Sequence, residues 1–321
     1  DWPVDFAEVK GQEHAKRAVE IAAAGGHNLL FMGPPGSGKT MLSQRIPSVL
    51  PPLRFDEALE TTKIYSVAGM LPRGASLVSV RPFRSPHHTI SDAGLIGGGG
   101  YPRPGEASLA HKGVLFLDEL PEFKKSALEA LRQPLEDGTV TIARAAISLT
   151  YPADFMLVAA LNPCPCGYHG DATHACVCSP AQVSRYRAKL SGPLMDRIDL
   201  QVEVPAVPYK DLKMDASPLS SAVMRQRILA ARERQSARYA NASIHLNSEL
   251  SGSLLSSVCR LGETEHRFLE GAVRRLGLSA RAHTRILRIA RTIADLDGDE
   301  TLRVEHLAEG VNLRNLDRRE L

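Results

Sequence analysis

Residues 33–40 read Gly-Pro-Pro-Gly-Ser-Gly-Lys-Thr, and this run restricts the possible folds of the chain more than any other feature. It fits the pattern G-x-x-x-x-G-K-[ST], in which glycines let backbone N–H groups turn toward phosphates. An apolar run at 28–32 precedes it, and a helical pattern at 39–46 follows it and is expected to stop at Pro47. The segment therefore predicts a strand, a phosphate-binding loop and a helix whose N-terminus adds partial positive charge.

This loop is expected to bind ATP. Lys39 would reach the β- and γ-phosphates, and Thr40 would place its hydroxyl on Mg²⁺. The alternative is a glycine-rich turn that binds nothing, and the flanking strand and helix disfavour it. The expected nucleotide-binding residues are Gly33, Pro34, Pro35, Gly36, Ser37, Gly38, Lys39 and Thr40.

A second apolar run, at 114–117, ends in Asp118 and Glu119. Strands of a parallel sheet read as continuous apolar runs, and open α/β sheets bind ligands at the carboxyl ends of their strands. Asp118 is suited to Mg²⁺, directly or through water, and Glu119 to polarising the attacking water. A strand that merely ends in solvated acids is the alternative, which the loop at 33–40 disfavours.

The composition is that of an ordinary globular protein. Of 321 residues, 43% are hydrophobic and 23% are charged, and the formal net charge is +3. No apolar stretch approaches the roughly 18 residues of a membrane span, and no signal-peptide pattern is visible. We therefore expect a cytoplasmic location and no membrane partner. Because the chain begins at Asp1 rather than methionine, we expect it to be a fragment of a longer protein.

Short apolar runs alternate with helical stretches in the first part of the chain, which predicts a doubly wound parallel sheet. Only helical periodicity follows, with Gly277, Gly298 and Gly310 as expected helix ends. We predict an α/β nucleotide-binding core at 1–206 and a small α-helical lid domain at 207–321. The expected strands are 28–32, 77–80, 114–118, 155–161 and 199–204, and the expected lid helices are 221–239, 248–259, 264–276, 280–296 and 303–313.

Together with further segments, these motifs resemble the AAA+ ATPases, in the clade of magnesium-chelatase and MCM ATPase subunits. Within that clade the chain is most similar to the ComM/YifB family, and the resemblance spans essentially the whole chain. It implies ATP hydrolysis with Mg²⁺ on a P-loop core followed by a helical lid, and assembly into a ring, usually a homo-hexamer. The segments that carry it, besides the loop, are 82–91, 93–99, 103–111, 113–122, 162–168 and 191–199.

The resemblance also implies catalytic roles for three polar residues. Asn162 follows the apolar run 155–161, where its amide would hold the attacking water or sense the γ-phosphate. Arg197 would be the arginine finger that acts on ATP held by a neighbouring subunit. Arg281 would reach from the lid to the γ-phosphate. The alternatives are a turn before Pro163 for Asn162, an ion pair with Asp196 or Asp199 for Arg197, and a solvated helix face for Arg281.

Four of the five cysteines lie close together, as Cys164-Pro-Cys166 and Cys176-Val-Cys178. In a chain of cytosolic character, clustered thiols are more often metal ligands than disulfides. Four thiolates suit tetrahedral Zn²⁺, although C-x-C is a weaker signal than C-x₂-C. We predict a structural zinc site. Free thiols, disulfides, and replacement of one cysteine by His169 or His174 are the alternatives.

Two segments are candidates for contact with DNA. Residues 139–142 and 146–150 alternate in polarity around Ala143-Arg144-Ala145, which predicts a hairpin with a basic tip. The resemblance implies that this hairpin projects into the pore of a ring, where Arg144 would meet DNA phosphates. The glycine-rich segment 85–105 resembles an insert that lines the same pore. Its His87 and His88 are expected to make polar contacts or to pack rather than to bind metal, and their role stays open.

Three functions are compatible with these residues. The resemblance implies a ring motor that moves on single-stranded or branched DNA, a helicase that drives branch migration during recombination of incoming DNA. The main alternative is a magnesium-chelatase-type motor subunit that remodels a protein partner. Chelatase motor subunits lack the insertion at 164–178, which favours the DNA motor. A nucleotide-gated switch without turnover is the third possibility, and it would need neither Glu119 nor Arg197.

Overall fold

The computed structural model describes residues 2–71, 74–99, 102–144, 147–171, 173–190, 192–208, 211 and 219–314, with backbone alone at 144 and 147. The chain forms two compact units. The P-loop unit comprises Phe31–Pro47 and Pro51–Arg197, and the lid-bearing unit comprises Asp1–Leu30, Ser48–Leu50 and Ile198–Leu321. A domain boundary at residue 206 stays a prediction.

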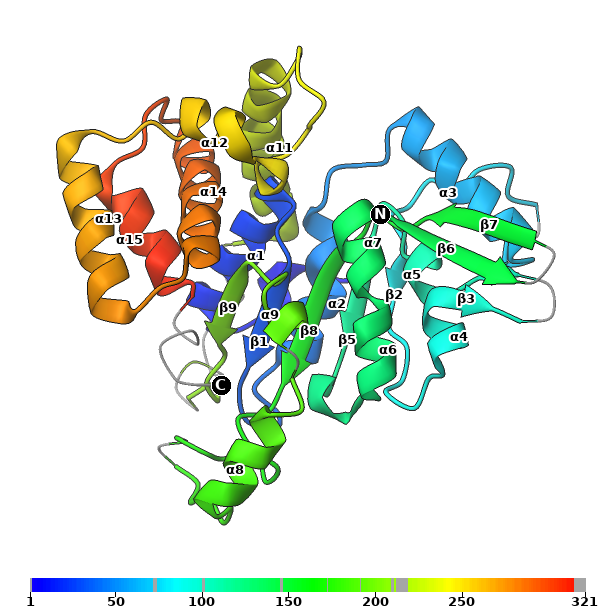
Figure 1. Ribbon diagram of the computed structural model, residues 1–321, viewed down its shortest axis with the longest axis horizontal. Coiled ribbons are helices and arrows are strands. Elements are labelled where there is room, and N and C mark those ends of the chain that lie inside the picture. The colour runs from blue at the N-terminus through cyan, green and yellow to red at the C-terminus, as the bar shows by residue number, and fades with distance from the viewer. Residues whose placement is uncertain are drawn as a thin grey trace. The chain divides into compact units, whose positions relative to one another are not determined.

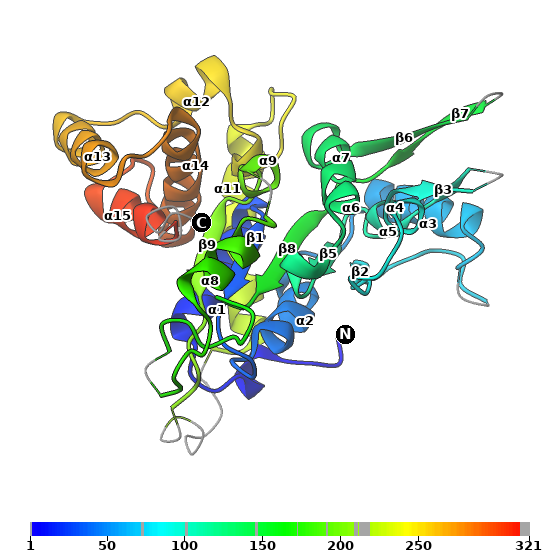
Figure 2. The ribbon, with the colours of Figure 1, turned by 60° about the horizontal axis from the view of Figure 1, so that its bottom comes forward.

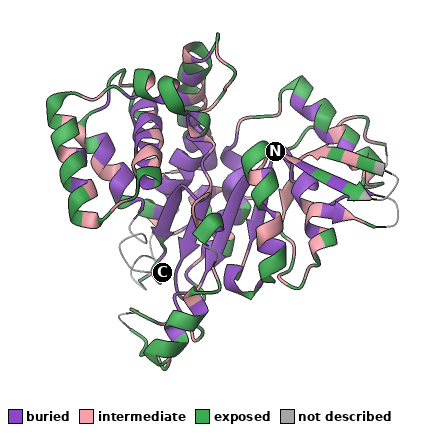
Figure 3. Cartoon of the chain, viewed as in Figure 1, coloured by how far each residue is buried: buried purple, intermediate pink, exposed green. Residues whose placement is uncertain are grey.

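A five-stranded sheet has the strand order β2-β5-β8-β1-β9. The pairs of β5 with β2 and with β8 are parallel, with Val114 opposite both Phe83 and Met156. Every residue of β5 and β8 is buried (Figure 3), as expected for a parallel sheet covered on both faces. The predicted α/β fold is therefore confirmed. The strands are β1 Leu29–Met32, β2 Phe83–Arg84, β5 Val114–Leu117, β8 Met156–Leu161 and β9 Leu200–Glu203.

The edge strand β2 differs from the prediction of a strand at 77–80. That segment is not a strand, and Val80 within it is 51% exposed. The edge position is taken instead by Phe83–Arg84, where the ring of Phe83 stacks on that of Phe116 with centroids 6.1 Å apart. The strand is thus found where a side chain packs on β5, and not in the apolar run that precedes it.

Short helices and two small hairpins complete the P-loop unit. Helix α2, Lys39–Val49, continues beyond Pro47, where a stop was predicted. Because Pro47 lies in the last turn, its missing N–H costs the helix a single backbone hydrogen bond. The other elements are α3 Phe55–Val67, α4 Asp92–Ile96, β3 Gly97–Gly98, β4 Arg103–Pro104, α5 Glu106–Leu109, η2 Leu120–Glu122, α6 Lys125–Ala130, α7 Arg132–Asp137, α8 Pro180–Arg187 and α9 Gly192–Met195.

An antiparallel hairpin is formed by β6, Thr139–Arg144, and β7, Ile147–Pro152, and its strands are longer than predicted. It is a separate two-stranded sheet, and its far end points away from β5 and β8 in both Figure 1 and Figure 2. Val140 and Ile142 are buried and hold it to its own unit. Residues 145 and 146 and the side chain of Arg144 lie outside the described residues.

The lid-bearing unit is mainly helical. Its helices are α1 Glu13–Gly25, α11 Ser221–Arg238, α12 Gly252–Val258, α13 Glu263–Leu276, α14 Ala280–Asp297 and α15 Val304–Asn312, with the 3₁₀ turns η1 Phe6–Glu8 and η3 Asn247–Glu249. The single helix predicted at 248–259 is thus η3 followed by α12. The hydrophobic core of the lid-bearing unit includes Leu250, Leu269, Ile286 and Leu307.

Glycine ends two of the lid helices as predicted. Gly277 and Gly298 cap α13 and α14 in the left-handed conformation, at φ +63° and +84°. Gly310 was also expected to end a helix, but it lies within α15. An added Cβ there would approach the Ile286 carbonyl oxygen of α14 to 3.3 Å. Gly310 therefore allows close helix packing.

Among the described residues, no helix is both long and apolar enough to cross a bilayer.

Candidate nucleotide-binding site and cysteine cluster

The loop at 33–40 connects β1 to α2, as the motif requires. Gly36 and Gly38 adopt φ values of +75° and +95°, a backbone conformation that favours glycine. These turns leave the loop wrapped around the N-terminus of α2, where backbone N–H groups and the helix dipole favour anions. The local geometry is that of a phosphate-binding loop.

Lys39 lies at the centre of this loop and is 8% exposed. Its Nζ donates hydrogen bonds to the carbonyl oxygens of Gly33 (2.8 Å) and Pro34 (2.9 Å) and to Oδ1 of Asn162 (3.2 Å). Burial lowers the pKa of Lys39, and the Asp118 carboxylate offsets part of that effect. The side chain thus ties the loop to the residue that follows β8.

Two oxygen ligands meet on the other side of the loop. The Thr40 hydroxyl donates to Oδ2 of Asp118 over 2.7 Å, and the N–H of Glu119 donates to Oδ1 of the same carboxylate over 2.9 Å. A hydroxyl beside a carboxylate suits Mg²⁺, which prefers oxygen ligands and binds few protein groups. The structure therefore brings Lys39, Thr40, Asp118 and Asn162 together at the carboxyl ends of β5 and β8.

Glu119 has an unexpected neighbour in His88. Nδ1 of His88 lies 3.2 Å from Oε2 of Glu119, and Glu119 itself adopts a left-handed backbone conformation with φ +53°. The His88 ring also packs against His87, with centroids 4.1 Å apart, and edge-on against Phe123. Sequence analysis missed this contact because many residues of glycine-rich chain separate the two partners.

Arg197 follows α9 in the P-loop unit. Its guanidinium forms an ion pair with Glu136 of α7 and donates to the carbonyl oxygen of Pro193. The Arg197 side chain is 20% exposed. Glu136 was not among the partners suggested by sequence, because it lies far earlier in the chain. The role of Arg197 in catalysis stays a prediction.

Arg281 lies in the first turn of α14, in the lid-bearing unit, and is exposed. Other arginines of the same helix are not on a solvated face. Arg285 pairs with Asp199 at 3.4 Å, and Arg291, only 1% exposed, pairs with Asp295 at 3.1 Å. Arg285 and Arg291 thus make ion pairs inside this unit. The role of Arg281 itself stays a prediction.

The four clustered cysteines converge. The sulfurs of Cys164, Cys166, Cys176 and Cys178 lie within 4.8 Å of one another. All five cysteines of the chain are described, and none forms a disulfide. Backbone N–H groups of Tyr168 and Val177 lower the pKa of Cys166 to about 6. His174 stacks on Tyr168 and pairs with Asp171, so it is oriented by other partners.

The cysteine-bearing loop contacts the phosphate-binding loop. Gly167 has φ +90°, and an added Cβ at this position would lie 2.5 Å from Cδ of Pro35. At its start, the loop follows Asn162, whose side chain contacts Lys39. The cysteine-bearing loop therefore contacts the phosphate-binding loop at Pro35, and Asn162, two residues before Cys164, contacts Lys39.

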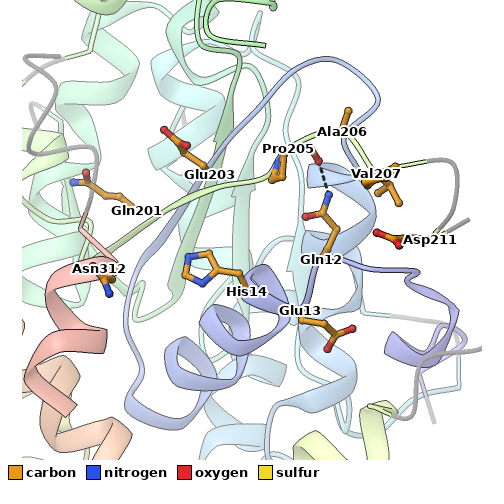
Figure 4. A pocket seen from close by; sticks show the side chains of 11 residues that line it. Gln12, Glu13, His14, Gln201, Glu203, Pro205, Ala206, Val207, Asp211 and Asn312 are labelled. Atoms are coloured by element: carbon orange, nitrogen blue, oxygen red, sulfur yellow. Dashed lines mark hydrogen bonds between the residues drawn. The ribbon is translucent and has the colours of Figure 1, made fainter. Parts of the chain in front are cut away.

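A separate cavity of about 450 Å³ lies in the lid-bearing unit (Figure 4). Polar side chains, including His14, Gln201 and Glu203, line it. The Gln12 amide donates to the carbonyl oxygen of Pro205 over 2.6 Å at its rim. No motif in the sequence pointed to this cavity.

Two family descriptions match the chain. Magnesium chelatase, subunit ChlI, matches residues 5–212, and magnesium chelatase, subunit ChlI C-terminal, matches residues 218–314. The first match contains the phosphate-binding loop, Asp118, Glu119, Asn162 and Arg197. The second contains Arg281.

Several known proteins are similar to the chain. YifB of Escherichia coli K12 is 48% identical over 320 residues, and the competence protein ComM of Haemophilus influenzae is 47% identical over 314 residues. These alignments cover 98% and 97% of this chain but 61% and 60% of the relatives, so the chain spans about six tenths of their length. The magnesium-chelatase 67 kDa subunit of Chlorobaculum parvum is 29% identical over 168 residues, 50% of this chain and 23% of that protein. The chain belongs to the magnesium-chelatase-like AAA+ family, in its ComM/YifB group.

Proposed function

We propose that this chain is the ATP-hydrolysing part of a ring motor that acts on DNA. The proposal depends mainly on one observation. The side chains of Lys39, Thr40, Asp118 and Asn162 lie in one site near the ends of three strands. Each group has the chemistry that a triphosphate with Mg²⁺ needs. Membership of the magnesium-chelatase-like family supports ATP turnover independently of this geometry.

Each residue of the site has a distinct task in this proposal. Lys39 and the N–H groups of the loop bind the phosphates, while Thr40 and Asp118 hold Mg²⁺, which neutralises phosphate charge when bound. Glu119 orients the attacking water and accepts its proton. The Asn162 amide fixes the position of that water relative to the γ-phosphate.

Turnover in this proposal requires a neighbouring subunit. Arg197 supplies a cation to ATP held by the next protomer, where it stabilises the charge that develops as the γ-phosphoryl group leaves. Before it meets phosphate, the guanidinium is paired with Glu136. Arg281 acts from the lid on the same γ-phosphate. A homo-hexameric ring in the cytoplasm is the assembly that we propose.

DNA is the proposed substrate of the motor. The similarity to a protein named competence protein ComM supports a role in the processing of incoming DNA. The β6–β7 hairpin, which projects from the P-loop unit, supports contact with single-stranded or branched DNA in a pore. Branch migration by helicase activity is the specific reaction that we propose.

A magnesium-chelatase-type motor that remodels a protein partner is the second candidate. The ChlI family match and the partial similarity to a chelatase subunit favour it. The two candidates differ in what stimulates ATP turnover. We expect forked or single-stranded DNA to increase the steady-state rate severalfold in the full-length protein.

The test measures ATP hydrolysis with and without DNA, using Glu119→Gln as the matched variant. Removing the general base lowers kcat by about 100-fold or more, while ATP binding stays within about threefold. Lys39→Ala, in contrast, is expected to lose binding itself. Full-rate hydrolysis by Glu119→Gln would overturn the assigned site, and the absence of DNA stimulation would overturn the DNA motor.

A further inference from the structure

Three of the four clustered sulfurs are spaced like the ligands of a tetrahedral metal ion, and the fourth, of Cys178, lies within 4.8 Å of them. Sγ of Cys164 lies 3.4 Å from that of Cys166 and 3.7 Å from that of Cys176, and Cys166 and Cys176 are 3.6 Å apart. A tetrahedral Zn²⁺ with Zn–S distances near 2.3 Å separates its sulfurs by about 3.8 Å. A disulfide would require about 2.05 Å.

The surroundings of the sulfurs also favour a cation. Cys164 is fully buried, and the other three thiols are half-buried. Backbone N–H groups of Tyr168 and Val177 donate hydrogen bonds to the sulfur of Cys166. Four thiolates this close repel one another unless a cation lies between them. Tetrahedral all-sulfur sites select zinc or iron among common metals.

We propose that Cys164, Cys166, Cys176 and Cys178 bind one structural Zn²⁺, and that this ion holds the loop 164–178 against the phosphate-binding loop. The loop is too short to have a hydrophobic core of its own, so the metal supplies its folding energy. The histidines considered in the sequence are not needed as ligands, because the four sulfurs complete the tetrahedron.

The metal would act on nucleotide binding through two contacts. Gly167, between the two pairs of cysteines, lies directly against Pro35 of the phosphate-binding loop. Cys164 is two residues from Asn162, whose Oδ1 accepts a hydrogen bond from Lys39. Fixing Cys164 and Cys166 therefore fixes both Pro35 and Asn162. This second half of the inference rests on the proposed ATP site, whereas the metal site does not.

The first experiment is elemental analysis of the purified full-length protein. We expect about one zinc per cysteine cluster, as four thiolates form one closed site. Cys176→Ser and Cys178→Ser are expected to lose that zinc, while the control Cys259→Ser, a buried thiol of the lid-bearing unit, retains it. The metal assignment would be overturned if the protein contained iron in place of zinc. It would also be overturned if the Cys176→Ser and Cys178→Ser proteins retained zinc.

The second experiment separates the effect of the metal from the effect of folding. Zinc is removed from the native protein with a chelator and then restored, and the affinity for a fluorescent ADP analogue is measured at each stage. We expect affinity to fall about tenfold and to recover, comparable to the loss of one hydrogen bond to a charged group. Unchanged affinity would overturn the coupling and leave the zinc site in place.

Two glycine variants test the contact itself. Gly167→Ala introduces a clash with Pro35, while Gly170→Ala, at a similar φ of +81°, meets nothing within 4 Å. We expect both proteins to keep zinc and only Gly167→Ala to bind nucleotide more weakly. Equal affinities in the two variants would contradict the coupling. Failure of the zinc-loaded wild-type protein to bind nucleotide would contradict the proposed function instead.

Discussion

The imidazole of His88 and the carboxylate of Glu119 are paired, with Nδ1 and Oε2 3.2 Å apart. Glu119 is more than half exposed, so without this contact its side chain would be free to rotate. His88 belongs to the glycine-rich segment 85–105, for which a position in the pore of a ring stays a prediction. The pair therefore connects the proposed general base to the glycine-rich segment.

Replacing His88 with alanine is expected to lower kcat about tenfold with little change in nucleotide affinity, because a mispositioned base loses transition-state stabilisation only. His88→Asn, which keeps a donor, is expected to recover part of the rate. His87→Ala is the control, since His87 hydrogen-bonds Thr89 rather than Glu119. Equal losses of kcat in His87→Ala and His88→Ala would show that the segment matters for packing instead.

The ion pair between Arg197 and Glu136 allows the catalytic role of Arg197 to be separated from a structural one. Arg197→Ala is expected to lower kcat by about 1000-fold, within the range for arginine fingers, while ATP binding persists. Glu136→Gln removes the same ion pair but leaves the guanidinium. We expect it to keep most of the turnover in a steady-state ATPase assay. If Glu136→Gln were as inactive as Arg197→Ala, the pair would be structural.

Asp199 stabilises the lid-bearing unit from a buried position between His27 (3.2 Å) and Arg285 (3.4 Å). Burial raises the pKa of Asp199, but the hydrogen bond with His27 and the charges of Arg285 and Arg288 outweigh it, so the pKa lies below its usual value. A depressed pKa stabilises the fold above the usual value near 4, and this contribution is lost as pH falls through the lower, folded-state pKa.

Asp199→Asn is therefore expected to lower the free energy of unfolding at pH 7 by about 3 kcal/mol, the typical cost of breaking a buried ion pair. The difference from wild type should shrink as the pH falls below about 4, which denaturant titrations at each pH would measure. Glu270→Gln removes an exposed pair with Arg274 and is expected to cost less than about 0.5 kcal/mol. A pH-independent effect of Asp199→Asn would contradict the assigned pKa shift.

The parallel sheet and the convergence of Lys39, Asp118 and Asn162 could be predicted, because Asp118 and Asn162 directly follow buried apolar runs and Lys39 ends the loop motif that follows another. The carboxyl ends of parallel strands meet at one edge, so locating the strands also locates these side chains. Local sequence patterns do not indicate which residues a long loop will contact. The contacts of His88 with Glu119 and of Gly167 with Pro35 depend on how loops return to the sheet.

Two further cases show the same limit within regular elements. The short apolar run at 77–80 predicted a strand, yet the paired residues are Phe83 and Arg84, and the ring of Phe83 stacks on that of Phe116. On α14, the spacing of arginines was compatible with a solvated face, but Arg291 is buried against Asp295. Periodicity identifies the residues that share a face and does not reveal what covers that face.

The most direct test of the central claim mixes two inactive variants of the full-length protein. Lys39→Ala chains lack nucleotide binding but keep Arg197, and Arg197→Ala chains bind ATP but lack the finger. If Arg197 acts on the neighbouring protomer, mixing the two restores ATP turnover, because sites on Arg197→Ala chains receive the guanidinium from Lys39→Ala neighbours. A mixture that assembles yet stays as inactive as its components would contradict the claim.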